Sequence, residues 1–401
     1  LEAVNRKLGV RRVIDLSAGA AAAGVSNTIS FASLNGYEAA LKLQGLALFA
    51  GQAAAADIEP EYIAVSADGT RAYVTLQEVN AVAVIDLTDP GATAPLAIQP
   101  LGAIDRNLAG NAFDASDQDG IDIATADVLS LPQPDAIASF TVAGVTYFVT
   151  ANEGDSRVGT GISDSVRLNS ASYVLGPVAY PDAAALKANA ALGRLNVLTS
   201  IGDTDGDGDF DQIHTLGGRG ISIFRQEADG SITKVRETGG EFEAIIAANH
   251  ASLYNSNQSL AASSVDSRSD DKGPEPEGVA IGQIGDRTYA FVGLERVGGI
   301  MVYDVTDPAN ARFVTYRPET AQDLGPETQA FISAASSPTG QALLVSGNEI
   351  SNTVTLYSVQ VQDDTANTLI GGAEADSFRA RGGDDAITGN GCNDAIDGGE
   401  G

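Results

Sequence analysis

The sequence predicts an all-β protein: a β-propeller of four-stranded blades, followed by the start of a parallel β-roll. Two observations predict the propeller. Short Val/Ile/Ala/Tyr runs alternate with glycine-containing turns, and four of the resulting hairpins share one acidic pattern. A third observation, a nine-residue repeat at the end of the chain, predicts the roll. We therefore expect a propeller over residues 1–361, a polar linker over 362–367 and calcium-binding repeats over 368–401.

The four hairpins begin at Glu59, Gln133, Pro274 and Gly325. Each opens with a proline followed by an acid and carries a second acid after its second strand. The last two openings lie 50 residues apart, close to the length of a four-stranded blade. The opening acids are Glu61, Asp135, Glu277 and Glu327, and the later acids are Glu78, Glu153, Glu295 and Glu349.

We count five blades and a remnant. The remnant spans residues 10–31, residues 101–120 are an insertion, and a weaker blade covers about 196–240 with "RGISIF" and "ITKVRET" as strands. A helix is predicted only over 180–193. The chain starts at Leu1 without a signal peptide and stops within a repeat, so we expect a partial chain and about seven blades in the intact protein. A β-sandwich is the alternative, which the repeated openings disfavour.

The composition of the chain limits the classes of molecule that it is expected to bind. The net charge of −30 argues against nucleic acid or an anionic membrane, because phosphates would be repelled, and it favours cations as ligands. The single cysteine, Cys392, excludes an internal disulfide. No apolar run approaches ~18 residues, so no ordinary membrane-spanning helix is expected. The oligomeric state is left open.

The C-terminal repeat has a period of nine from Gly371 onward. It matches the nonapeptide GGxGxDxUx, in which aspartates of stacked turns hold calcium and the apolar residue fills the roll. It resembles the RTX repeats of proteins secreted by Gram-negative bacteria, which implies type I secretion and an extracellular or cell-surface location. Glu374, Cys392 and Ala380-Arg381 depart from the pattern, and a disordered acidic tail is the alternative. The predicted calcium ligands are Asp376, Asp385 and Asp394, with Phe378, Ile387 and Ile396 in the interior.

A second calcium signal is the stretch "DTDGDGDFD" at 203–211. It matches the start of an EF-hand-type loop, in which side chains at positions one, three and five bind the ion and glycine allows the sharp turn. His214 stands at position twelve, where a bidentate glutamate is expected. We therefore predict a calcium loop inserted in a blade, with a solvated acidic loop as the alternative; His214 and His250 are expected to be solvated. The predicted ligands are Asp203, Asp205, Asp207, Asp209 (backbone carbonyl) and Asp211 (through water).

Equivalent positions of successive blades fall on one ring, so up to eight carboxylates should converge at one end of the central channel. Such a cluster is costly unless its members bind cations or protons. Carboxylate-bound metal beside arginines suits metal-assisted phosphoester hydrolysis. Alternatively, the acids cap backbone amides and pair with arginines for stability alone. For metal binding we select Glu61, Asp135, Glu153, Glu327 and Glu349, and for catalysis Glu277, Glu295, Arg157 and Arg296.

Longer motifs carry a family resemblance. The stretches "PDAIASF", "TANEGDSR", "GDTDGDGDFD" and "TYAFVGLERVGGIMVYDVTDPAN" resemble the choice-of-anchor I family over about residues 10–360. The resemblance implies a secreted or surface-attached propeller; some relatives are described as atypical alkaline phosphatases, and an animal branch as mesenchyme-specific cell-surface glycoproteins. Two hypotheses follow. One is an extracellular phosphomonoesterase acting on phosphate esters with calcium or another divalent metal in the channel. The other is a non-catalytic, calcium-stabilised surface or matrix protein that binds a glycan or a neighbouring subunit.

Overall fold

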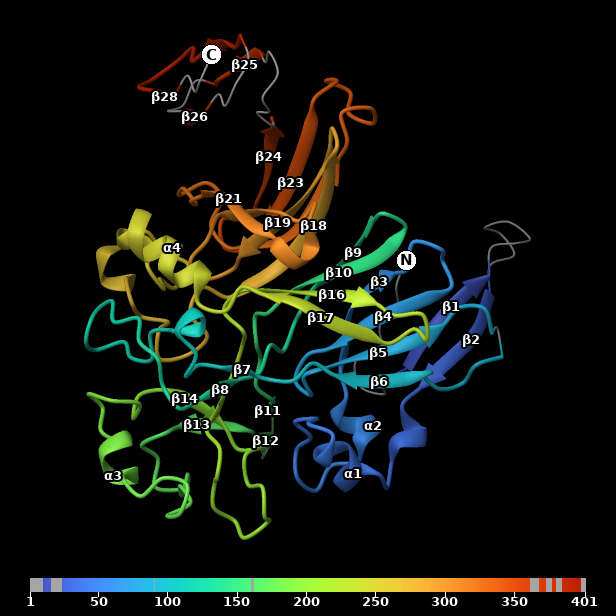
Figure 1. Cartoon of the computed structure of the whole chain (residues 1–401), viewed down its shortest axis with the longest axis vertical. Coiled ribbons are helices and arrows are strands. Elements are labelled where there is room, and N and C mark those ends of the chain that lie inside the picture. Colours follow the sequence, from blue (N-terminus) through green and yellow to red (C-terminus); the bar gives the residue numbers. More distant parts are fainter. Residues whose placement is uncertain are drawn as a thin grey trace.

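The computed structural model describes residues 10–15, 24–89, 91–159, 162–360, 368–372, 377–379 and 384–397. Within them the fold is all-β and is organised around four antiparallel sheets, each built in the up-and-down order of a propeller blade (Figure 1). The first sheet contains β3 (Pro60–Val65), β4 (Arg71–Leu76), β5 (Ala81–Asp86) and β6 (Ala97–Pro100). The third contains β18 (Pro276–Ile284), β19 (Arg287–Leu294), β20 (Ile300–Asp304) and β21 (Arg312–Arg317).

The second and fourth sheets depart from this regular pattern. The second has its first two strands separated from the last two by a long insertion: β9 (Ile137–Val142), β10 (Val145–Ala151), β16 (Ile221–Gln226) and β17 (Ile232–Glu237). The fourth has three strands, β22 (Pro326–Ile332), β23 (Ala342–Asn348) and β24 (Thr353–Val359). The four predicted hairpins are therefore the leading strand pairs of the four sheets.

The weaker blade predicted at 196–240 is wrong. Its strands β16 and β17 complete the second sheet, because β16 pairs with β10. The intervening chain folds with the insertion after β6 into a separate five-stranded sheet, in which Leu129–Ser130 and His214–Thr215 pair in parallel. Its strands are β7 (Ile104–Asp105), β8 (Leu129–Ser130), β13 (Ser165–Arg167), β14 (Asn196–Leu198) and β15 (His214–Thr215). Two further two-stranded sheets are β11 (Val158–Gly159) with β12 (Ile162–Ser163), and β1 (Val10–Asp15) with β2 (Gly24–Ser30).

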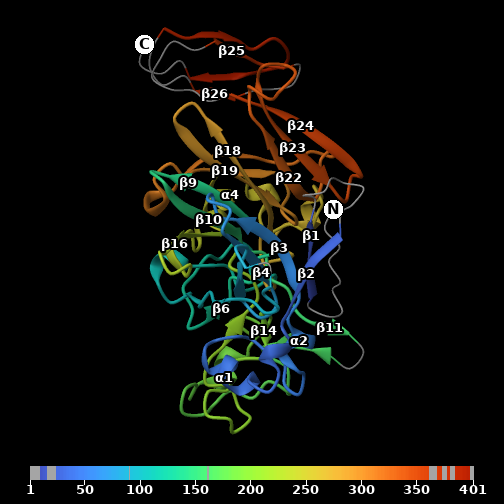
Figure 2. The same cartoon turned by 90° about the vertical axis from the view of Figure 1, so that its right-hand side faces the viewer.

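Neighbouring sheets meet through their first strands. β3 lies against β9, β9 against β18, and β18 against β22, so the four sheets follow one another along an arc with their first strands inside (Figures 1 and 2). The largest apolar core lies between the second and third sheets, where Val149 and Ile223 pack with Val292 and Met301. This arrangement brings equivalent positions of successive sheets toward one another, as the repeat predicts.

Helices are few and short: α1 (Glu38–Leu43), α2 (Ala54–Asp57), α3 (Ala183–Leu186) and α4 (Glu241–Asn249). The helix predicted over 180–193 is reduced to α3, because the chain turns after Leu186 and the Lys187 ammonium binds the carbonyls of Ser170 and Tyr173 at 2.7 and 2.6 Å. The sequence analysis missed α4, although acids in its first turn signal a helix start. No described helix has the length and apolarity needed to cross a membrane.

The C-terminal segment contains four short strands beyond β24: β25 (Thr368–Ile370), β26 (Ser377–Arg379), β27 (Ala386–Thr388) and β28 (Ala395–Asp397). β25 pairs in parallel with β27, and β26 with β28, so strands two repeats apart are neighbours. Leu369, Phe378 and Ile387 pack together, whereas Ile396, predicted to be interior, is 54% exposed. The predicted linker 362–367 and Asp376 lie outside the described residues.

Candidate functional site

The opening acids of three sheets lie in β-bulges. The pairing register shifts between Pro60 and Ile63 in β3, and the same irregularity follows Pro276 in β18 and Pro326 in β22. Proline is tolerated as the first residue of a strand, and an extra residue in a bulge turns a side chain out of the regular alternation. The bulges thus contain the three opening glutamates Glu61, Glu277 and Glu327.

The later acids are held at the same end of the sheets by a repeated backbone contact. The N–H of Glu295 donates to the carbonyl of Glu275 at 2.8 Å, and the N–H of Glu349 donates to Gly325 at the same distance. In the second sheet the N–H of Gly154, directly after Glu153, donates to Gln133 at 3.0 Å. Each acceptor immediately precedes the opening proline, so the two acids of a sheet are fixed near each other.

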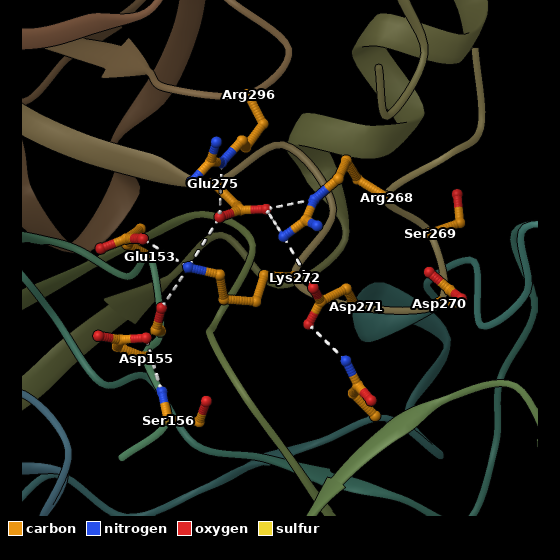
Figure 3. A network of polar contacts seen from close by, with 12 residues as sticks. Glu153, Asp155, Ser156, Arg268, Ser269, Asp270, Asp271, Lys272, Glu275 and Arg296 are labelled. Carbon is orange, nitrogen blue, oxygen red and sulfur yellow. Dashed lines mark hydrogen bonds and ion pairs between the residues drawn. The ribbon is translucent and has the colours of Figure 1, made fainter. Parts of the chain in front are cut away.

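Glu153 of the second sheet and Glu275 before the third converge on one lysine, Lys272 (Figure 3). Oxygens of Glu153, Glu275 and Glu295 lie within 4.8 Å of one another. The Lys272 Nζ lies 2.5 Å from Glu153 Oε1 and 2.7 Å from Glu275 Oε2, and it also donates to the carbonyl of Gly154 at 2.7 Å. Burial opposes the charged ammonium, but the charges of Glu275 and Glu153 outweigh burial and raise the pKa of Lys272.

Two arginines complete this group. Arg268 Nη2 lies 2.6 Å from Glu275 Oε1, and Arg296 lies 3.4 Å from Glu275 Oε2 and 3.0 Å from Glu295 Oε1. The Glu275 side chain has no exposed surface, so its charge depends on these cations. We call the six residues the lysine-centred cluster: Glu153, Lys272, Arg268, Glu275, Glu295 and Arg296. Its ammonium contacts two of the three glutamates, Glu153 and Glu275.

Glu277 lies next to this cluster without such a counter-charge. Its Oε2 is buried and finds no hydrogen-bond partner within the part of the chain that the structure describes. Burial, followed by repulsion from Glu153 and Glu295, raises the pKa of Glu277 to about 11, and Asp135 and Glu327 add to the rise. The structure therefore places the opening acids of three sheets near one another, and burial with repulsion from Glu349 also raises the pKa of Glu327.

A second group of acids lies in the first sheet. Oxygens of Glu59, Glu61 and Glu78 lie within 4.8 Å of one another, and we call these residues the glutamate triad. Glu78 is 7% exposed, and its Oε2 is buried without a hydrogen-bond partner among the described residues. Burial raises the pKa of Glu78 to about 8, and repulsion from Glu59 adds to this effect. Glu59 and Glu61 are half-buried, so solvent reaches the triad.

Arg157, selected for catalysis, is engaged in a buried ion-pair network. Its Nε lies 2.7 Å from Asp57 Oδ1, and its Nη1 lies 2.6 Å from Asp164 Oδ2. Sequence reasoning missed both carboxylates, because one comes from α2 and the other from the insertion. The positive charge of Arg157 offsets part of the rise in the pKa of Glu78, which indicates that the guanidinium lies near the glutamate triad. Arg296, with 28% of its side chain exposed, is the more accessible of the two arginines.

The aspartate loop, residues 203–211, belongs to the inserted sheet region and not to a blade. Oxygens of Asp203, Asp205 and Asp211 lie within 4.8 Å of one another, whereas Asp207 is outside this set and accepts from the Asp209 N–H at 3.0 Å. Asp203 accepts from the N–H groups of Gly206 and Gly208 at 2.7 and 3.1 Å. Phe210 anchors the loop by stacking on Tyr173, with ring centroids 4.0 Å apart.

The histidines are less exposed than expected. His214 is 3% exposed, and burial lowers its pKa to about 4, so the prediction of a solvated side chain is wrong. The parallel pairing of β15 with β8 places it inside the inserted sheet. His250 is half-buried, with its ring edge-on to Tyr316 at 5.1 Å.

Comparisons with known proteins agree with the motifs. A model of the choice-of-anchor I domain matches residues 7–308. Gigasin-3a of Magallana gigas is 32% identical over 198 residues, which are 44% of this chain and 67% of gigasin-3a. The mesenchyme-specific cell surface glycoprotein of Strongylocentrotus purpuratus is 31% identical over 243 residues, which are 53% of this chain and only 31% of that protein. A Lactobacillus plantarum protein of known structure is 12% identical with a TM-score of 0.43, and the match covers 90% of this chain and 63% of that one. The chain belongs to the choice-of-anchor I domain family.

Proposed function

We propose that this chain is a calcium-binding β-propeller that acts outside the cell or on its surface. Membership of the choice-of-anchor I domain family supports this location, as does the name of the sea urchin relative, a cell surface glycoprotein. A net charge of −30 supports cations as ligands, because it makes binding of a divalent ion electrostatically favourable.

The aspartate loop carries this proposal. Three of its carboxylates offer oxygens within 4.8 Å of one another, and hard oxygen ligands of this kind suit calcium. Repulsion from Asp207, Asp211 and Asp205 adds to desolvation and raises the pKa of Asp209, so a bound cation would relieve repulsion across the loop. Asp211 accepts from the Thr204 hydroxyl at 2.6 Å, which closes the loop around this set.

The C-terminal repeats extend the proposal to further calcium ions and to an export route. Their aspartates, Asp376, Asp385 and Asp394, keep a period of nine. We propose that the repeats bind calcium after type I secretion from a Gram-negative bacterium, since calcium is scarce inside the cell and plentiful outside it. Binding that occurs only in the folded state would stabilise the segment there.

The test compares thermal unfolding of the full chain in millimolar calcium and in EGTA. We expect calcium to raise the unfolding midpoint, and the double variant Asp203→Asn/Asp205→Asn to reduce this increase. A matched control, Asp286→Asn/Asp307→Asn, removes two exposed acids elsewhere and should retain the full increase. An unfolding midpoint that is the same in calcium and in EGTA would contradict calcium binding.

A second candidate function is metal-dependent phosphomonoester hydrolysis. It is favoured by the partly exposed Arg296 beside Glu295, with Glu277 nearby, since an arginine can bind a phosphate through two hydrogen bonds while carboxylates hold a metal. The substrates would be phosphate esters, and a metal ion would polarise the phosphoryl oxygens.

The assay for this candidate uses p-nitrophenyl phosphate with and without chelator. Turnover that disappears in Glu277→Gln/Glu295→Gln, while the variant keeps its far-UV circular dichroism, would support hydrolysis. No turnover with calcium, magnesium, manganese or zinc would instead support a non-catalytic surface or matrix protein, with a glycan or a neighbouring subunit as partner.

A further inference from the structure

The Glu78 carboxylate is a buried polar group that the contacts within the described chain do not explain. It is 7% exposed, and one of its oxygens is buried without a hydrogen-bond partner among the described side chains and backbone groups. A buried polar atom that lacks a partner destabilises the folded state, and more so when it is charged. This carboxylate lies with Glu59 and Glu61 in the glutamate triad. A single cation could therefore bind Glu78 and its two neighbours together.

We propose that the glutamate triad binds one calcium ion, at a site separate from the aspartate loop. The inference deepens the proposed calcium binding and rests on it for the choice of ion. Calcium–oxygen distances of about 2.3–2.6 Å allow two ligands of one ion to lie up to about 5 Å apart. The triad oxygens meet this limit, because all lie within 4.8 Å of one another. Three carboxylates and no nitrogen or sulfur ligand favour a hard cation.

Arg157, whose charge acts on Glu78, is already engaged by two other acids. Arg157 acts on Glu78, but its guanidinium lies 2.7 Å from Asp57 and 2.6 Å from Asp164, so its charge is balanced by those two acids. Asp155, which is exposed, acts on Glu78 with a further negative charge. A cation from solution would therefore supply the partner that the buried Glu78 oxygen lacks among the described residues.

The fold also holds these ligands ready. Glu61 lies in the bulge between Pro60 and Ile63, and Glu59 directly precedes that bulge. Glu78 lies in the turn after β4, where the Asn80 N–H donates to the Gln77 carbonyl at 2.9 Å and Asn80 has a φ of 55°. Because the bulge and the turn belong to paired strands, the three carboxylates are brought together before any ion binds. Half-buried Glu59 and Glu61 leave the ion a path from solvent and room for water ligands.

The experiment counts calcium ions bound per full-length chain by equilibrium dialysis. Free calcium is raised to about 10 mM, above the range in which extracellular modules bind. We expect Glu59→Gln/Glu61→Gln to bind one ion fewer than the wild type. A count equal to that of the wild type would overturn the inference. Urea unfolding in EGTA verifies that the variant is folded, and Glu78→Gln provides an independent variant with the same expected loss.

Two further variants separate this inference from the proposed function. Asp203→Asn/Asp205→Asn should lose the ion of the aspartate loop and keep that of the triad, so the loop and triad variants together should lose two ions. If the loop variant binds as many ions as the wild type while the triad variant loses one, the loop assignment fails and the triad stands. The surface control Asp286→Asn/Asp307→Asn should bind the same number as the wild type, and a loss there would overturn both assignments.

Discussion

The lysine-centred cluster and the glutamate triad both gather acids of the repeat, but they differ in the cations that the chain places beside them. Each collects three glutamate oxygens within 4.8 Å at the same end of the sheets. In the cluster, the chain itself supplies Lys272 and two arginines. In the triad, the buried Glu78 oxygen lacks a partner among the described residues. The repeat therefore brings acids together at both places, and residues outside the repeat determine which cations the chain supplies beside them.

The largest expected effect comes from removing the internal cation. Lys272→Met leaves Glu153 and Glu275 buried and facing each other, and breaking a buried ion pair in this way costs about 3–5 kcal/mol. Urea unfolding in EGTA should report this loss in the free energy of unfolding. Addition of calcium should restore part of it, because the variant converts the cluster into a group of acids like the triad.

Lys234→Met is the matched control for that variant. Lys234 lies 3.6 Å from Glu237, a longer contact than those of Lys272, and 30% of its side chain is exposed, so its removal should cost less than removal of Lys272. A Lys272→Met variant as stable as this control would show that the ammonium does not hold the cluster together and would remove the contrast with the triad.

The second effect is the contribution of the triad to the pH dependence of stability. Burial raises the pKa of Glu78 from 4.5 to about 8, so the folded state retains a proton that the unfolded state releases. In EGTA, stability should therefore fall as pH rises between these values, by an amount on the order of a few kcal/mol. Calcium should suppress the fall, because the ion replaces the proton.

Other acids titrate in the same pH range, so the contribution of Glu78 is measured as the difference between the wild type and Glu78→Gln. Urea unfolding of the wild type and of Glu78→Gln is compared at pH 6 and pH 9, with and without calcium. In EGTA the wild type should lose more stability than the variant, and in calcium the two should lose the same amount. Equal losses in EGTA would mean that Glu78 is not the group responsible.

The sequence predicted the acids better than the cations. Proline-acid openings and acids after the second strand recur in the sequence, and the structure places them at one end of the sheets through bulges and tight turns. Lys272 and Arg268 lie in the irregular stretch before β18, where no periodicity indicates which carboxylate they meet. Arg157 forms an ion pair with Asp57 of α2, which lies 100 residues earlier in the chain. The prediction of a separate blade at 196–240 failed for a similar reason. The third strand of the second sheet follows a 69-residue insertion between Ala151 and Ile221.

The third prediction compares one neutralised glutamate in each group. Glu153→Gln should cost about 1–3 kcal/mol at pH 7 in EGTA, because it removes the charge that lies 2.5 Å from Lys272. Glu78→Gln should change stability by less than about 0.5 kcal/mol under the same conditions, because a glutamate with a pKa of about 8 is already largely protonated there. Urea unfolding measures both values. A greater loss in Glu78→Gln than in Glu153→Gln would reverse the assignment of internal and external counter-charges.

Within the lysine-centred cluster, the smallest effect is expected for Arg296→Met, since the cluster's three cations are of unequal importance. Arg296 has 28% of its side chain exposed and lies 3.4 Å from Glu275, which keeps Arg268 at 2.6 Å and Lys272 at 2.7 Å. Its removal should cost about 1 kcal/mol or less, as for an exposed ion pair. The same variant separates structural from catalytic roles. If the protein hydrolyses p-nitrophenyl phosphate and Arg296 binds the phosphoryl group, turnover should fall by at least about tenfold while the free energy of unfolding hardly changes. A loss of stability as large as that of Lys272→Met would instead make Arg296 an essential part of the cluster.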